Sequence, residues 1–155
     1  MHATIRLYIA YKWGEIMSAC TFFGHRDCPE AVREQVRRAV EHLILHHGVD
    51  MFYVGNQGRF DAIVRGVLSQ LAQEYPQIRY AVVLSALPKV QQDSSDTMLP
   101  EGIEAIHPRY AIDWRNNWML KQSNFVVSYI THWWGGAAKY VQKAERTGKT
   151  VIHLT

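Results

Sequence analysis

The stretch SACTFFG, residues 18–24, is a short apolar run that ends on glycine. Such a run predicts a strand that is buried on both faces of a sheet. A helix is predicted next, because Pro29 suits a first helical turn and Gly48 suits a helix end. Between them, apolar residues recur at the helical period, namely Val32, Val36, Ala39, Val40, Leu43 and Ile44.

The alternation of strand and helix continues along the chain. Apolar runs predict further strands at residues 51–54, 79–84, 124–130 and 151–154. Patterned stretches predict helices at residues 60–74, 110–122 and 135–148, the last with Ala137, Val141 and Ala144 facing inward. Strands that alternate with helices form parallel sheets, and right-handed crossovers make such sheets open and doubly wound. We therefore predict an α/β fold, with an open, mostly parallel sheet and helices on both faces.

The alternation breaks between residues 85 and 108, a stretch that contains three prolines. We predict a long loop there, interrupted by a short strand near residues 103–106. Irregular loops of this length are usually functional lids or mobile inserts. At the other end, Met17 directly precedes the first patterned segment. We expect residues 1–16 to be an N-terminal extension and residues 17–155 to form a single domain.

The composition of the 155-residue chain is that of an ordinary globular protein. Its 17 Lys+Arg and 14 Asp+Glu give a net charge of +3, too mild for a dedicated nucleic-acid binder. No apolar run reaches the roughly 18 residues of a membrane span. Cys20 and Cys28 match neither a CxxC redox pair nor a zinc-ligand pair, which fits free thiols. We therefore expect a cytoplasmic protein that makes no contact with a membrane.

The sequence gives no support for a metal or a cofactor. His42 and His46 have the i, i+4 spacing of metal ligands, but histidines also suit a helix C-terminus without any metal. Neither the GxGxxG dinucleotide motif nor the P-loop motif occurs. We therefore expect no metal and no cofactor.

Three glycine-bearing turns follow predicted strands and lead into predicted helices. They cover residues 24–27 (GHRD), 55–61 (GNQGRFD) and 131–137 (THWWGGA). In an open parallel sheet, ligands bind outside the carboxyl ends of the strands. Helix N-termini attract phosphates, and glycine lets the backbone approach an anion closely. We therefore expect a phosphate-bearing ligand at these turns, although glycine also serves such turns through its backbone freedom alone.

Several side chains in these turns are candidates for binding a ligand or for transferring a proton. Arg26 is suited to a bidentate pair with a phosphate. Asp27 is a candidate to orient a ribose hydroxyl or to act as a base, or to cap the following helix. His25 is a candidate acid or base, or a hydrogen-bonded turn residue. The candidate ligand-binding residues are Gly24, His25, Arg26, Asp27, Gly55, Gln57, Gly58, Phe60, Asp61, Arg115, Asn116, Trp134, Gly135 and Gly136.

The predicted helix 110–122 carries two of the five tryptophans. Trp114 and Trp118 are four residues apart, so they share one face of the helix, which we expect to face the core. Arg115 and Asn116 then face elsewhere and can reach over the strand ends.

Trp133 and Trp134 lie together in the third turn. Two adjacent side chains cannot both point inward from one turn, so we expect at least one to line a pocket or an interface. A tryptophan in that place is a candidate for stacking on a base. Exposed aromatic residues of the segment 85–108 or of the last helix are candidates for a homo-oligomer interface.

Five motifs occur in an order that resembles a known family. They are FFGHRDCP (22–29), YVGNQGRFD (53–61), RYAIDWRNNWML (109–120), Gly135-Gly136 and KTVIHL (149–154). Over nearly all of residues 17–155 the chain resembles the SLOG superfamily, in particular its small stand-alone bacterial and prophage members of unassigned function. The resemblance implies a Rossmann-like sheet that binds a nucleotide or nucleotide-derived ligand at the strand ends. Related proteins are the LOG-type phosphoribohydrolases and the DNA-processing protein DprA.

LOG-type enzymes carry a GGxGTxxE motif whose Glu supports N-glycosidic cleavage. Aligned on Gly135-Gly136, this chain has Ala138, Lys139 and Gln142 at the positions of Gly, Thr and Glu. A glutamine cannot act as a carboxylate base. If the chain is an enzyme of this kind, Asp27 and Asp61 are the candidate catalytic residues.

Three functions compete on these grounds. The leading hypothesis is a binding module for a nucleotide or an ADP-ribose-like molecule. The second is a nucleotide N-glycosidase. The third is single-stranded nucleic-acid binding through exposed aromatic side chains and scattered Lys and Arg.

Overall fold

The computed structural model describes residues 16–87 and 96–155. In this part of the chain one sheet has the strand order β4-β3-β2-β1-β5-β6, and all its pairings are parallel. The strands are β1 (Ala19–Gly24), β2 (Met51–Val54), β3 (Arg79–Val83), β4 (Thr97–Met98), β5 (Phe125–Tyr129) and β6 (Thr150–Leu154). The helices are α2 (Val32–His47), α3 (Gly58–Glu74), α4 (Ala111–Gln122) and α5 (Gly136–Arg146).

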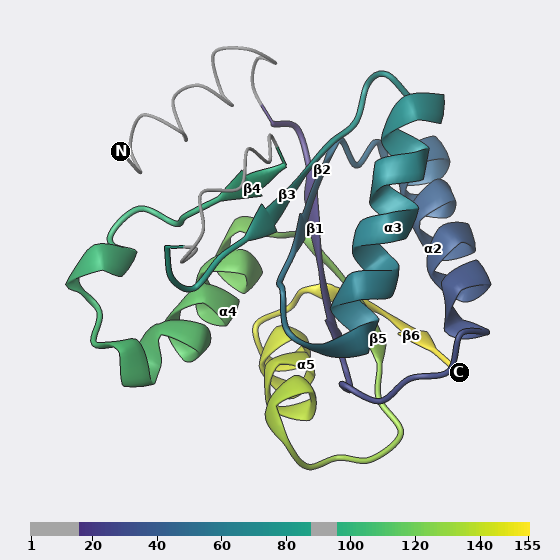
Figure 1. The fold of residues 1–155 in the computed structure, drawn as a ribbon. Coiled ribbons are helices and arrows are strands. Elements are labelled where there is room, and N and C mark those ends of the chain that lie inside the picture. The colour runs from purple at the N-terminus through teal and green to yellow at the C-terminus, as the bar shows by residue number, and fades with distance from the viewer. Residues whose placement is uncertain (1–15, 88–95) are drawn as a thin grey trace.

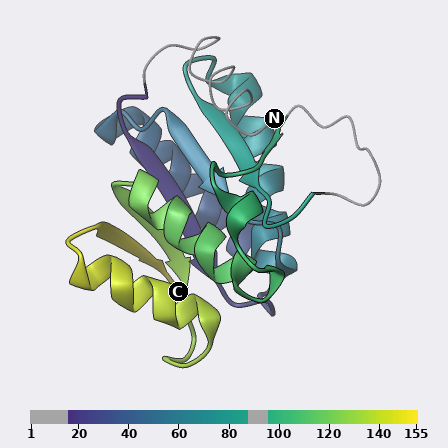
Figure 2. The same cartoon turned by 90° about the vertical axis from the view of Figure 1, so that its left-hand side faces the viewer.

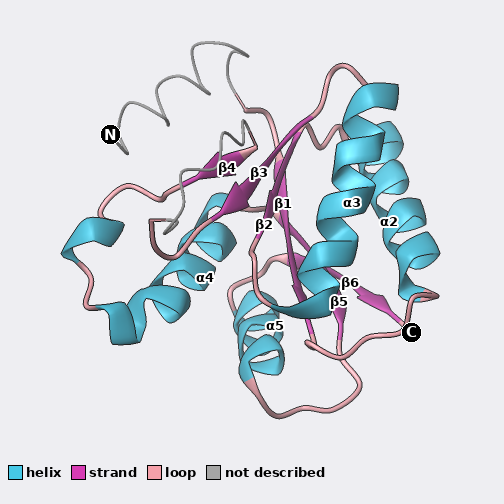
Figure 3. Ribbon diagram, viewed as in Figure 1, coloured by secondary structure: helices cyan, strands magenta, loops and turns pink. Residues whose placement is uncertain are grey.

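Helices cover both faces of the sheet. Helices α2 and α3 lie on one face, and α4 and α5 lie on the other (Figures 1 and 2). The sheet runs between these two layers (Figure 3). This arrangement confirms the predicted α/β fold with a parallel, doubly wound sheet.

Strand β1 supplies both cores because its side chains alternate between the two faces. Cys20 and Phe22 belong to the core on the side of α2 and α3. Ala19 and Phe23 belong to the core on the side of α4 and α5. The chain runs outward from β1 through β2, β3 and β4, then returns to place β5 on the other side of β1. The reversal between β1 and β5 creates a crevice at their carboxyl ends, where ligands of such folds bind.

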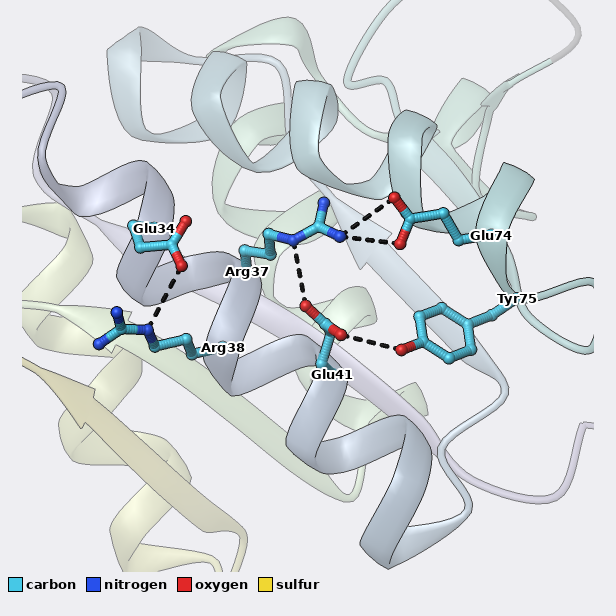
Figure 4. A network of polar contacts seen from close by, with 6 residues as sticks. All are labelled: Glu34, Arg37, Arg38, Glu41, Glu74 and Tyr75. Carbon is cyan, nitrogen blue, oxygen red and sulfur yellow. Dashed lines mark hydrogen bonds and ion pairs between the residues drawn. The ribbon is translucent and has the colours of Figure 1, made fainter.

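A polar network joins α2 to the end of α3 (Figure 4). The Arg37 guanidinium lies 2.8 Å from Glu74 and 3.1 Å from Glu41. The hydroxyl of Tyr75 donates a hydrogen bond of 2.8 Å to the Glu41 carboxylate. Surface ion pairs of this kind contribute little individually, so the buried apolar face of each helix carries most of the packing energy.

The prediction of a short strand near residues 103–106 was wrong. Residues Ile103–Ala105 form a 3₁₀ turn (η1), which begins after Gly102 at a φ of 93°. The additional strand is β4, which pairs Thr97 and Met98 with the edge of β3. A second 3₁₀ turn, Pro108–Tyr110 (η2), leads into α4.

Two predicted helix faces need correction. In α4, Trp114 and Trp118 are only half-buried, whereas Arg115 and Met119 are buried and face the sheet. The tryptophans flank this face and pack at its sides. In α5, Ala138 is buried in place of the predicted Ala137, while Val141 and Ala144 are buried as expected.

Three further expectations concern the N-terminal extension, the two cysteines and a membrane span. The predicted extension lies outside the described residues except for its last residue, Ile16, which packs against the core beside α4 and α5. Cys20 and Cys28 are buried and form no disulfide. None of the described helices is long and apolar enough to cross a membrane.

The packing of Gly24 generates a stability prediction. A Cβ on Gly24 would collide with the ring of the fully buried Phe60, whereas a Cβ on Gly136 would meet nothing within 4 Å. We expect Gly24→Ala to lower the free energy of unfolding by about 1–3 kcal/mol through overpacking. Gly136→Ala is the matched control and should change it by less than about 0.5 kcal/mol. Denaturant titration of both variants measures this, and equal effects would contradict the packing described.

Candidate functional site

A cleft of about 310 Å³ opens at the carboxyl end of β1, between the turns that precede α3 and α5. The expected residues that line it are Gly24, His25, Arg26, Gln57, Asp61, Arg115, Asn116 and Gly136. The lining also includes Ala137, which the sequence analysis placed in the third turn. It further includes residues that were not candidates, namely Phe22, Phe23, Ile112, Met119 and Tyr140. Segments far apart in the chain therefore meet at the crevice where the topology places a ligand.

Other expected residues lie beside this cleft. Asp27 is exposed, Phe60 is fully buried under Gly24, and Trp134 and Gly135 lie outside the lining. Gly55 and Gly58 instead line a second hollow of about 490 Å³ between α3 and β3, and Asp61 borders both spaces.

The guanidinium of Arg115 is buried under the cleft, with 1% of the residue exposed. Its Nη1 donates to the Val83 carbonyl at 2.7 Å and to Asn56 Oδ1 at 3.0 Å. Its Nε donates to Asn116 Oδ1 at 2.8 Å. Burial lowers the pKa of Arg115, and the charge of Asp61 opposes that shift. Through these bonds Arg115 connects α4 to the ends of β2 and β3.

Asp61 faces inward from the first turn of α3. The residue is partly exposed, but protein surrounds its carboxyl group, and this desolvation raises the pKa of Asp61 to about 6. A hydrogen bond of 2.9 Å from the Gln57 backbone N–H to Oδ2, and the charges of Arg115 and Arg26, limit the shift. A carboxyl group that titrates near neutral pH inside a cleft has the property expected of an acid or base.

The glycines of the first two turns are needed by the protein's own packing. The ring of Phe60 occupies the space beside Gly24. A Cβ on Gly55 would lie 2.9 Å from the Asp61 carboxylate and 3.2 Å from the Arg115 guanidinium. Gly58 has a φ of 85°, which favours glycine, and packs against Arg26.

The N-termini of α3 and α5 differ in what already occupies them. In the turn before α3, Gln57 N–H donates to Asp61, and Arg59 N–H donates to the Arg26 carbonyl at 3.1 Å. Helix α5 has no side-chain cap, and its Gly136 borders the cleft with open space where a Cβ would lie. The first N–H groups of a helix have no partner within that helix, so α5 offers the better anion site.

Tyr140 forms the floor of the cleft next to α4. Its hydroxyl donates to Asp113, which also accepts a 3.0 Å bond from Lys139 Nζ. The Tyr140 hydrogen bond lowers the pKa of Asp113, and burial raises the pKa of Tyr140. These contacts fix α5 against α4, and with it the position of the uncapped N-terminus.

His25 lies at the edge of the cleft and accepts a long hydrogen bond of 3.4 Å from the His132 backbone N–H. Burial lowers the pKa of His25, and the neighbouring charge of His132 acts in the same direction. The neutral, hydrogen-bonded form of this turn histidine is therefore favoured.

A serine, a histidine and a glutamate are hydrogen-bonded in series away from the cleft. Ser128 Oγ lies 3.0 Å from His153 Nδ1, and His153 Nε2 lies 2.8 Å from Glu145. Ser128 is fully buried within β5, so no substrate reaches its hydroxyl. This series is a structural link between β5, β6 and α5.

No group of three or more potential metal ligands is found among the described residues. Near the end of α2, the ring of His42 contacts the rings of His46 and His47.

Two solved structures have a similar fold, both of them DNA processing protein A (DprA). The Streptococcus pneumoniae protein matches with a TM-score of 0.63 and 12% identity over 89% of this chain and 50% of its own. The Helicobacter pylori protein, described with a single-stranded DNA binding mode, matches with a TM-score of 0.62 and 10% identity over 90% of this chain and 66% of its own. At such low identity the likeness concerns the fold alone. No protein-family model and no curated protein matches the chain.

The environment of Asp61 generates a prediction about pH and stability. Its pKa in the folded protein, about 6, lies above the ordinary 3.8. The wild type therefore loses stability relative to Asp61→Asn as the pH rises from about 4 to about 7.5, by about 2–3 kcal/mol. Denaturant titrations at both pH values measure this difference. Asp27→Asn, which removes an exposed carboxylate, controls for the change in net charge, and a pH-independent effect of Asp61→Asn would contradict the raised pKa.

Proposed function

We propose that this chain binds a nucleotide, or a nucleotide derivative such as ADP-ribose, in the cleft at the carboxyl end of β1. The N-terminus of α5 carries the proposal. It has no side-chain cap among the described residues, and it borders the cleft at Gly136, where an added Cβ would meet none of their atoms within 4 Å. A phosphate at that point would accept hydrogen bonds from backbone N–H groups and interact favourably with the helix dipole.

Arg26 is the cationic side chain suited to the same phosphate. It lines the cleft and is exposed, and its Nη2 donates to Gln57 Oε1 at 3.1 Å. Arg115, by contrast, is committed to three acceptors inside the protein. In this proposal Arg26 contacts the ligand, and Arg115 with Asp61 shapes the wall behind it.

The proposal agrees with the SLOG resemblance. The motifs FFGHRDCP and YVGNQGRFD contain Arg26 and Asp61, and the third contains Arg115, all of which border the cleft. We therefore propose that the chain is a SLOG-type binding module.

Single-stranded nucleic acid is the second candidate ligand. It is favoured by the exposure of Trp133 and Trp134 near the cleft, 58% and 70%, since bases stack on exposed aromatic rings. The H. pylori DprA of similar fold is itself described as binding single-stranded DNA. A net charge of only +3 supplies a weak phosphate-backbone attraction. Retention of a labelled oligonucleotide at low salt, without any response to mononucleotides, would favour this candidate.

Ligand screening tests the main proposal. Nucleotides, NAD, ADP-ribose and phosphosugars are added in a thermal-shift assay, where a ligand at 100 times its Kd stabilises by about 2.7 kcal/mol. Loss of a charged hydrogen bond should make Arg26→Gln bind at least about tenfold more weakly. Arg38→Gln is the matched control, because Arg38 is 78% exposed on α2 and paired with Glu34. The absence of any shift at millimolar ligand would overturn the proposal.

An N-glycosidase activity is the enzymatic alternative, favoured by the pKa of about 6 at Asp61. If it occurs, base release from a nucleoside monophosphate should fall by about 10²-fold or more in Asp61→Asn. Asp27→Asn separates the two candidate carboxylates, since Asp27 lies outside the cleft lining. Chromatography of the released base measures the rate, and unchanged release in both variants would exclude these residues.

A further inference from the structure

Three aromatic rings beside the cleft form a stacked column, which we call the ring column. The rings of His25 and His132 lie 3.8 Å apart with an interplanar angle of 18°. The rings of His132 and Trp134 lie 3.9 Å apart at 21°. His25, at one end, borders the cleft, so the column runs from the cleft along the turn that precedes α5.

The outer end of the ring column is open. Trp134 is 70% exposed, and His132 covers one face of its indole, so the exposure belongs to the other face and the ring edges. Among the described residues, His132 is the one ring in contact with Trp134. A flat apolar face of this size is a ready stacking surface for another ring.

The middle ring contributes by stacking. His132 Nδ1 is buried and has no hydrogen-bond partner among the described residues. The imidazole lies between the rings of His25 and Trp134 and stacks on both of them.

Trp134 lies close in the chain to the proposed phosphate site. Trp134 precedes Gly136 by two residues, so their Cα atoms are at most about 7 Å apart. The ribose of a single nucleotide bridges a span of that order between its phosphate and its base.

We infer that the open face of Trp134 stacks on the base of a purine nucleotide whose phosphate lies at the N-terminus of α5. The inference rests on the proposed function and specifies its ligand. A purine has two fused rings, as indole does, and so offers more stacking area than a pyrimidine. Stacking is sequence-tolerant in general, and its strength follows this area.

Trp133 provides a matched control within the same turn. It is 58% exposed, but its ring meets His153 edge-on, at 6.3 Å and 68°, and belongs to no stack. Trp133→Ala and Trp134→Ala therefore remove equal side chains from adjacent exposed positions, and only the second removes the end of the ring column.

The test is calorimetric titration of the full chain with AMP, UMP and ribose 5-phosphate. In the wild type, AMP should bind more tightly than UMP. Trp134→Ala should weaken AMP binding by about 5- to 150-fold and abolish the preference for AMP over UMP. Binding of ribose 5-phosphate should be unchanged, Trp134→Phe should restore part of the AMP affinity, and Trp133→Ala should leave all three affinities unchanged.

The outcomes separate the inference from the proposed function. If ribose 5-phosphate and both nucleotides bind but Trp134→Ala changes none of them, the inference is overturned while the proposed function stands. If none of the three binds, the inference is overturned, and the proposed function is decided by the wider ligand screen. If Trp134→Ala instead converts a dimer to a monomer in light scattering without changing AMP affinity, Trp134 is an interface between copies of the chain and the inference is overturned.

Discussion

The buried guanidinium of Arg115 is the interaction on which the cleft depends. A charged group taken out of water is strongly unfavourable unless hydrogen bonds and opposite charge compensate it. Here the carbonyl at the end of β3, the Asn56 side chain after β2 and the Asn116 side chain on α4 provide the acceptors. Helix α4 must therefore lie across the strand ends in one position, and the cleft takes its shape from that position.

Asp61 extends the same constraint to the first turn of α3. Its carboxylate approaches the Arg115 guanidinium over Gly55, and it accepts the Gln57 N–H. In the turn before α3, the backbone N–H of Gln57 is therefore hydrogen-bonded within the protein. The backbone N–H of Arg59 is too, because it donates to the Arg26 carbonyl. Within the described part of the chain, no side chain caps the N-terminus of α5. These two glycine-bearing turns therefore differ: the polar groups of the turn before α3 bond within the protein, whereas the N-terminus of α5 has no side-chain cap among the described residues.

The turn before α5 also carries the ring column, so recognition of a phosphate and of a flat ring would fall on neighbouring residues of one segment. Its position is fixed by α5, which the Tyr140–Asp113–Lys139 contacts hold against α4. A preorganised segment loses little conformational entropy when it binds a ligand. The same α4 that Arg115 places over the sheet therefore also positions the uncapped N-terminus of α5.

The sequence by itself determined the order of strands and helices except for β4, together with the α/β class and the glycine-bearing turns at the strand ends, because periodicity and turn preferences act between near neighbours. It also pointed to most of the residues that line the cleft. The tertiary structure decided that Arg115 is fully buried against the sheet while Trp114 and Trp118 stay half-buried at the sides of that face, because the acceptors of Arg115 come from residues 56 and 83. It likewise decided that Phe60 fills the space beside Gly24 while Gly136 faces open space. Burial and hydrogen-bond satisfaction depend on partners distant in the chain, and local patterns carry no information about those partners.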